Sequence, residues 1–128
     1  GKSSFIVATA NGAGSVATGL YASGATVSAS NLGTVKAIAT GTTTTTTTAY
    51  GAELVSPGAL TFTNTGIVRA NADHAVAVDL TSGTTATLIN TGTINAVPMV
   101  LGTNGIAVET SAPNAVIQNS GTITGKLR

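Results

Sequence analysis

Several residue types that stabilise or equip ordinary globular domains are scarce in this chain. Cysteine is absent, which excludes a disulfide framework and a thiolate metal site. Tryptophan is also absent, aromatic residues make up 3% of the chain, and charged residues make up 7%, against about 25% in ordinary globular domains. The hydrophobic fraction of 42% is largely alanine and valine, whose small side chains can fill only a narrow core.

The charges that are present do not gather. The five basic residues are scattered along the sequence: Lys2, Lys36, Arg69, Lys126 and Arg128. With no basic patch and no interleaved aromatics, we expect no nucleic-acid binding. No segment approaches the roughly 18 apolar residues of a membrane span, so we expect no membrane insertion. A net charge of +1 and a positive mean hydropathy do not fit the disorder signature, and 128 residues predict one ordered domain.

What the chain has is an internal repeat: Asn, any residue, Gly, any residue, then a β-branched residue. Four copies begin at asparagines and contain the paired glycines, in order Asn31 and Gly33, Asn64 and Gly66, Asn90 and Gly92, Asn119 and Gly121. The asparagines are 33, 26 and 29 residues apart, inside the range of 20–50 that indicates solenoids and propellers. We expect a tight turn at each copy, with glycine supplying a positive φ.

The residues before each asparagine alternate with a period of two, which predicts a strand with one buried face. The two inward positions are occupied in the four copies by Val27 and Ala29, Leu60 and Phe62, Ala86 and Leu88, and Ala115 and Ile117. A second column lies upstream, at residues 19–22, 51–54, 75–78 and 105–108, each before a turn-like stretch. Each unit therefore predicts strand, turn, strand, Asn-Gly turn and strand, with no helix.

The same Asn-Gly turn recurs after about one coil length, which favours a coil over a β-sandwich. In a sandwich, turns also recur, but they do not keep the same residue at the same position. Equivalent residues of a coil stack about 4.8 Å apart in parallel sheets. The sequence thus predicts an all-β, single-domain parallel β-solenoid of about four rungs, a rung being one full turn of the coil. The four asparagines are expected to form a structural ladder of stacked amides.

Residues 1–18 are interpreted as an N-terminal capping or leading strand segment, and 19–128 as the repeats, with a threonine-rich loop at 41–49. The threonine run consists of Thr42, Thr43, Thr44, Thr45, Thr46, Thr47 and Thr48. We expect a loop bulging from the solenoid, because insertions in repeats map to loops; a contact loop and a cluster of attached glycans are sharper alternatives. An ice-binding face would need threonines that alternate along strands and recur between rungs, whereas consecutive threonines point to opposite faces.

Candidate reactive groups are few. Asp79 and Glu109 align on adjacent rungs at a separation near the roughly 5 Å of retaining glycosidases. We prefer the explanation that both occupy the solvated end of a strand before a turn, because no Trp or Tyr platform for a sugar accompanies them. Asp73 and His74 form an adjacent pair in a loop without a nucleophile. The opening Gly1-Lys2-Ser3-Ser4 lacks the upstream part of a phosphate-binding loop. We therefore expect no enzyme activity, no catalytic residue, no metal and no cofactor.

Residues 105–125, with Gly-Ile-Ala-Val, a turn, Ala-Val-Ile-Gln-Asn-Ser-Gly-Thr-Ile-Thr-Gly, carry a family resemblance. The pattern resembles the passenger repeats of bacterial autotransporters and filamentous-haemagglutinin-like adhesins, and extends over roughly 19–125. The resemblance implies a right-handed β-helix at the bacterial cell surface or outside the cell.

The expected function is a structural and adhesive segment that acts as stalk and contact surface. Its partners would be copies of itself, or a glycan or protein of a host or cell surface. Alternatives are a self-assembling extracellular filament subunit and a phage tail-fibre or spike segment that binds surface polysaccharide. An exposed apolar stripe would favour the spike, and uncapped strand edges would favour the filament.

Overall fold

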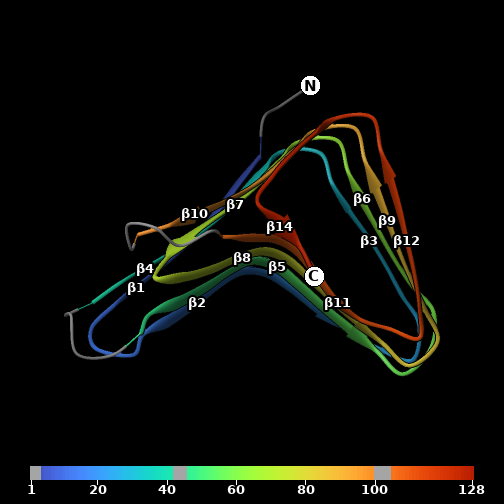
Figure 1. Ribbon diagram of the computed structural model, residues 1–128, viewed down its shortest axis with the longest axis horizontal. Helices are drawn as coiled ribbons and strands as arrows, with labels where there is room; N and C mark the ends of the chain where they lie inside the picture. The colour runs from blue at the N-terminus through green and yellow to red at the C-terminus, as the bar shows by residue number, and fades with distance from the viewer. Residues whose placement is uncertain (1–3, 42–45, 100–104) are drawn as a thin grey trace.

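A computed structural model describes residues 4–41, 46–99 and 105–128. All regular structure in these residues is β, and the strands coil into a parallel solenoid of about four rungs (Figure 1), which confirms the predicted fold class. Each rung contributes one strand to each of three sheets. The first strands are β1 (Phe5–Asn11), β2 (Val16–Ser23), β3 (Val27–Asn31) and β4 (Thr34–Thr40).

The later rungs repeat this order. The second contains β5 (Thr48–Ser56), β6 (Leu60–Asn64) and β7 (Ile67–Ala72), and the third contains β8 (His74–Ser82), β9 (Thr85–Asn90) and β10 (Thr93–Pro98). The last strands are β11 (Ile106–Ser111), β12 (Asn114–Asn119), β13 (Thr122–Thr124) and β14 (Lys126–Leu127).

The three sheets form the sides of a wedge in Figure 1. Sheet A has the order β1-β4-β7-β10-β13, sheet B the order β14-β11-β8-β5-β2, and sheet C the order β12-β9-β6-β3. The Asn-x-Gly turn joins sheet C to sheet A, and we call it the asparagine corner. Sheets A and B converge on the side away from sheet C.

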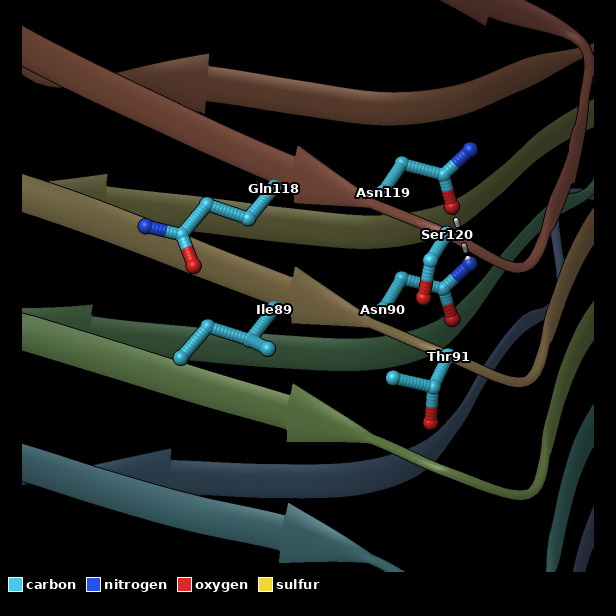
Figure 2. A pocket seen from close by; sticks show the side chains of 6 residues that line it. All are labelled: Ile89, Asn90, Thr91, Gln118, Asn119 and Ser120. Atoms are coloured by element: carbon cyan, nitrogen blue, oxygen red, sulfur yellow. Dashed lines mark hydrogen bonds between the residues drawn. The ribbon is translucent and has the colours of Figure 1, made fainter.

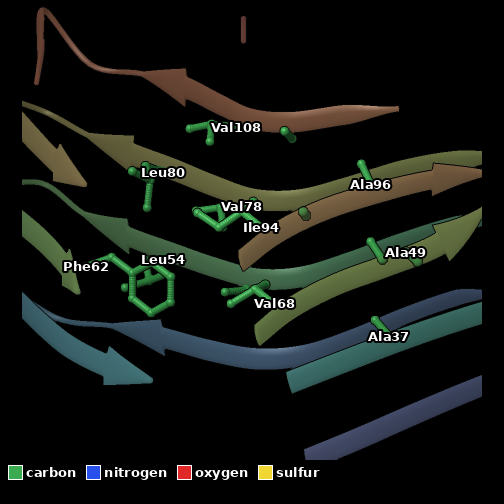
Figure 3. Packing of buried hydrophobic residues seen from close by; sticks show 14 of the residues in the cluster. Ala37, Ala49, Leu54, Phe62, Val68, Val78, Leu80, Ile94, Ala96 and Val108 are labelled. Atoms are coloured by element: carbon green, nitrogen blue, oxygen red, sulfur yellow. The ribbon is translucent and has the colours of Figure 1, made fainter. Parts of the chain in front are cut away.

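Side-chain size explains the wedge. Where sheets A and B converge, the buried residues are small: Ala37, Ala39, Ala49, Ala70, Ala72, Ala75 and Ala96. Where sheet C spreads them apart, the core is filled by larger residues, namely Leu54, Leu60, Phe62, Leu80 and Leu88. Figure 3 labels Leu54, Phe62 and Leu80 among them. Interiors are close-packed, so a core of graded side-chain volume sets the spacing of the sheets.

The strands of sheet B bend near their middle (Figure 1). In the first two rungs these strands contain an interior glycine, Gly19 in β2 and Gly51 in β5. A Cβ on Gly51 would lie 2.5 Å from the carbonyl oxygen of Ala77 and 2.7 Å from Cγ1 of Val68. Absence of a side chain therefore lets the backbone of sheet B approach both the next rung and sheet A. After the bend, alternation resumes with Glu53 outward and Leu54 inward.

The predicted division at residue 18 falls inside β2. Residues 5–11 form β1, which pairs with β4 as the outermost strand of sheet A, with Ile6 beside Val35 and Ala8 beside Ala37. The leading segment thus forms a strand of the stack in the described residues.

Candidate functional site

The asparagine corner holds a ladder of side-chain amides. Asn31 Nδ2 donates to Asn64 Oδ1 at 2.8 Å, Asn64 Nδ2 to Asn90 Oδ1 at 2.7 Å, and Asn90 Nδ2 to Asn119 Oδ1 at 2.7 Å. Asn31, Asn64 and Asn90 are buried, and Asn119 is exposed in the last rung. Each amide thus points along the coil axis toward the following rung (Figure 2 shows the last pair).

Each asparagine also closes its own turn. Asn64 Nδ2 donates to the carbonyl oxygen of Gly66 at 3.2 Å and to that of Thr93, one rung on, also at 3.2 Å. The backbone N–H of Gly33 donates to Asn31 Oδ1 at 3.2 Å. One side chain therefore bonds both within its own turn and between rungs, which makes the corner a structural element rather than a reactive one.

The glycines of this corner are needed for a reason other than the predicted one. Gly33, Gly66, Gly92 and Gly121 do not have positive φ; among the described residues only Gly12, Gly14 and Gly125 do. A Cβ on Gly66 would instead collide with the carbonyl oxygen of Gly33 in the preceding rung, and one on Gly92 with that of Gly66. Close stacking of identical turns, and not backbone conformation, excludes a side chain here.

The outer face of sheet B carries a column of three carboxylates. Glu53, Asp79 and Glu109 are register partners on β5, β8 and β11. The alignment of Asp79 with Glu109 agrees with the sequence prediction, but Glu53 was missed because residues 51–54 were aligned with 75–78. They pair with 77–80, and the shared acidic-leucine pairs Glu53-Leu54 and Asp79-Leu80 would have revealed this.

Electrostatics distinguish the middle carboxylate. Burial first, and then the nearby charges of Glu109 and Glu53, raise the pKa of Asp79 to about 6. Burial, followed by the charges of Asp79, Glu53 and Glu109, also raises the pKa of the neighbouring Tyr50. Asp79 thus holds a proton closer to neutral pH than an ordinary aspartate, as a general acid beside a second carboxylate does. Glu109 is partly balanced by Arg128, whose Nε lies 3.8 Å from Glu109 Oε1.

The outer face of sheet C bears no charged side chain, because its four strands contain none. Two outward columns run across it: Ser28, Thr61, Thr87 and Val116, and Ser30, Thr63, Ile89 and Gln118. Threonine here does alternate along β6 and recur on β9, but apolar and amide residues interrupt both columns on the last rungs. Sequence reasoning overlooked this face, although the alternating threonines of 61–63 and 85–87 were visible.

A shallow hollow lies at the edge of this face, beside the asparagine corner (Figure 2). It has a volume of about 300 Å³ and is lined by Ile89, Asn90, Thr91, Gln118, Asn119 and Ser120. Because Asn90 and Asn119 are engaged in the ladder, only Gln118 and the two turn hydroxyls offer polar groups to a ligand.

The C-terminal end of the threonine run is part of the solenoid. Thr42, Thr43, Thr44 and Thr45 lie outside the described residues. Thr46 is exposed, Thr47 is 1% exposed, and Thr48 is the first residue of β5. The predicted loop to residue 49 therefore extends too far, since burial withdraws Thr47 from contact with a partner.

Asp73 secures that end of the run. Its Oδ2 accepts hydrogen bonds from the backbone N–H and the hydroxyl of Thr47, at 3.1 and 3.0 Å. Thr47 Oγ1 in turn accepts from the backbone N–H of Asp73 at 3.1 Å. His74 begins β8 instead of lying in a loop, and the carboxylate beside it is committed to this structural contact.

No further site geometry emerges from the described residues. Within them, no group of three or more His, Cys, Asp or Glu side chains is placed to hold a metal ion. Of the opening tetrapeptide, residues 1–3 lie outside the described part, and Ser4 is exposed. A search of the same residues finds no helix with the length and apolarity of a membrane span.

Comparison of the chain with protein-family models, with curated proteins and with solved structures gives no match.

Proposed function

We propose that this chain is a structural and adhesive segment of a secreted or cell-surface β-helical protein, in which the coil is a spacer and its outer faces make contacts. The observation that carries the proposal is the continuous asparagine ladder across all four rungs. A solenoid with such a ladder is extendable by further rungs of the same kind, because each rung contacts only its neighbours. The repeat resemblance supports a right-handed passenger of a bacterial autotransporter or related adhesin.

Sheet C is the face that we assign to adhesion. Its outward Ser28, Thr61, Thr63, Thr87 and Gln118 offer donors and acceptors on a sheet without charge. Hydroxyl and amide groups exchange hydrogen bonds with the hydroxyls of a glycan or with the polar surface of a protein. Such a face imposes no charge selection, so recognition depends on shape and hydrogen bonding.

Adhesion can be tested with the labelled chain on arrays of glycans and extracellular-matrix proteins. We expect binding that is lost in a Thr61→Lys and Thr87→Lys double variant, because two ammonium groups then stand on the contact face. A Thr34→Lys variant, altered on the outer face of sheet A, is the matched control and should still bind. Binding that survives the double variant and fails in the control would assign the contact to sheet A instead.

The carboxylate column belongs to this non-catalytic proposal as part of an outer face. The competing interpretation is glycoside cleavage by Asp79 with Glu53 or Glu109. Release of reducing ends from surface polysaccharides, abolished by Asp79→Asn, would replace the structural proposal with an enzymatic one.

A filament subunit is the second candidate, favoured by apolar residues that are uncovered in the last rung, such as Ile117 and Leu127. The strand counts oppose simple end-to-end stacking. Sheets A and B have five strands and sheet C has four, so placing β1 on β13 and β2 on β14 leaves one strand position empty between β12 and β3. Long unbranched fibres in negative-stain micrographs would nevertheless raise this candidate above the adhesin.

A further inference from the structure

The outer face of sheet A carries basic residues and that of sheet B carries a column of carboxylates, and Lys126 begins the last strand of sheet B, β14. Lys36 on β4 and Arg69 on β7 are register partners on sheet A, and no strand of that sheet contains an acidic residue. The carboxylates Glu53 and Asp79 are register partners on sheet B. Since sheets A and B form two different sides of the wedge (Figure 1), the two rows of charge face away from each other. They are therefore unable to neutralise one another within one chain.

These two rows are also unpaired within the described residues. The ion pair found there joins Arg128 to Glu109, at the C-terminal end of the carboxylate column. Arg69 Nε donates to Asn71 Oδ1 at 3.0 Å, a neutral partner on the same strand that holds the guanidinium over the sheet. Two cations on one face and two anions on another thus lack partners of opposite charge.

The charged residues have the same spacing in the two rows. Lys36 and Arg69 stand on neighbouring strands of sheet A, as Glu53 and Asp79 do on sheet B, and neighbouring strands lie about 4.8 Å apart. Two solenoids with parallel axes therefore bring both pairs into register at once. The cations belong to the first and second rungs and the anions to the second and third, so a shift of one rung aligns them.

We propose that copies of this chain associate side by side, with Lys36 and Arg69 on sheet A of one copy facing Glu53 and Asp79 on sheet B of the next. The contact uses different surfaces on the two copies, so it is heterologous and extends into an open row instead of closing as a dimer. In the proposed stalk, such rows join neighbouring molecules laterally, and sheet C stays accessible for adhesion.

The strength of the contact follows from its exposure. Each exposed ion pair contributes little and is screened by salt, so a chain of four rungs associates weakly. Burial first, and then the nearby charges of Glu109 and Glu53, raise the pKa of Asp79 within a single copy. Cations from a second copy lower that pKa, so association is stronger above pH 6 than below it.

The test is sedimentation velocity of the complete chain at pH 7.5, at ionic strengths of about 0.01 M and 0.15 M, where the Debye length is about 30 Å and 8 Å. We expect the average mass to exceed 12.3 kDa and to rise with concentration at low salt, and to return to the monomer value at the higher salt. A monomer at low salt and high concentration would overturn the proposal.

Charge reversal makes the test specific. The Lys36→Glu and Arg69→Glu double variant and the Glu53→Lys and Asp79→Lys double variant should each be monomeric, and an equimolar mixture of the two should associate again. A Thr61→Glu and Thr87→Glu variant on sheet C controls for the introduction of two carboxylates on another face and should associate like the unaltered chain. Association of either charge-reversed variant alone, or none in their mixture, contradicts the proposed pairing.

Circular dichroism checks that each variant is folded, and Lys36→Gln with Arg69→Gln replaces the reversal if that variant unfolds. The inference rests on the proposed function only in assigning the rows to a stalk. Adhesion is measured on the sheet C variants and association on the sheet A and B variants, so failure of one leaves the other standing.

Discussion

Two corners of the coil differ in how much the length of their connections varies. At the asparagine corner every turn has two residues between strands, and each contains the same glycine. At the corner from sheet A to sheet B, the connections span residues 12–15, 41–47, 73 alone, 99–105 and 125 alone. A ladder of side chains inside the first corner breaks if one turn changes length, whereas the described residues of the second corner form no such ladder. Constant length therefore marks the corner where rungs are joined by side chains, and variable length marks the corner where insertions are tolerated.

The largest expected effect is at a glycine of the asparagine corner. Gly92→Ala should lower the free energy of unfolding by about 4 kcal/mol, because the new Cβ collides with the backbone of the preceding turn. Urea unfolding followed by circular dichroism measures the change. The control is Gly24→Ala at the corner from sheet B to sheet C, where the nearest atom is 3.3 Å away. Equal effects in the two variants would remove the special status of the asparagine corner.

The buried side chains are larger in the wide part of the core, near sheet C, than in the narrow part between sheets A and B. Phe62→Ala in the wide part should lower the free energy of unfolding by about 3–5 kcal/mol through the cavity that it leaves. Ala70→Leu in the narrow part should lower it by about 1–3 kcal/mol through overpacking between sheets A and B. Thermal or urea unfolding of both variants tests the wedge, and an Ala70→Leu variant more stable than the unaltered chain would contradict it.

The amide ladder itself can be interrupted. Asn90→Ala should lower the free energy of unfolding by about 1–3 kcal/mol, because it leaves the buried amide of Asn64 short of an acceptor. Asn119→Ala, at the exposed end of the ladder, is the matched control and should lower it less. A melting curve for Asn90→Ala that coincides with that of the unaltered chain would show that the ladder does not stabilise the fold.

A contact between Thr47 and Asp73 is one of the specific side-chain contacts at the variable corner. A double-mutant cycle with Thr47→Val and Asp73→Ala should give a coupling free energy of about 1 kcal/mol, because the Thr47 hydroxyl donates to the Asp73 carboxylate in a part-buried site. Unfolding of the two single variants and the double variant supplies the measurement. Simple additivity would mean that these two side chains do not stabilise one another.

The smallest effect is expected away from both corners, on the outer face of sheet B. The pKa of Asp79 is about 6 in the folded chain against a reference value of 3.8, so folding takes up a proton between these values and stability falls as pH rises through them. Asp79→Asn should therefore raise the free energy of unfolding at pH 7 by about 1 kcal/mol, a value reduced for solvent screening. Below about pH 4 the advantage should vanish. Melting curves across this range test it, and an advantage independent of pH would exclude ionisation as its cause.

Particular residues show where sequence reasoning reached its limit. The alignment of Leu60 with Ala86 and of Asn64 with Asn90 was predicted correctly. In both rungs the strand and the turn that follows it are adjacent in the sequence and repeat in the same order, so the local pattern specifies their alignment. Glu53 was placed two positions out of register, because the connections between sheets A and B differ in length and local pattern does not specify their alignment. Thr47 was assigned to a loop because nothing local indicates its contact with Asp73.

The sequence by itself determined the parallel solenoid, the number of rungs and the residues at the asparagine corner, since a period of two and a recurring turn are local properties of the chain. Only the tertiary structure decided why glycine is required at that corner, which carboxylates share a column, and that Lys36 and Arg69 lie on a different face from Glu53 and Asp79. These depend on how rungs stack and how far apart the sheets stand, and both follow from packing between residues that are distant in the chain.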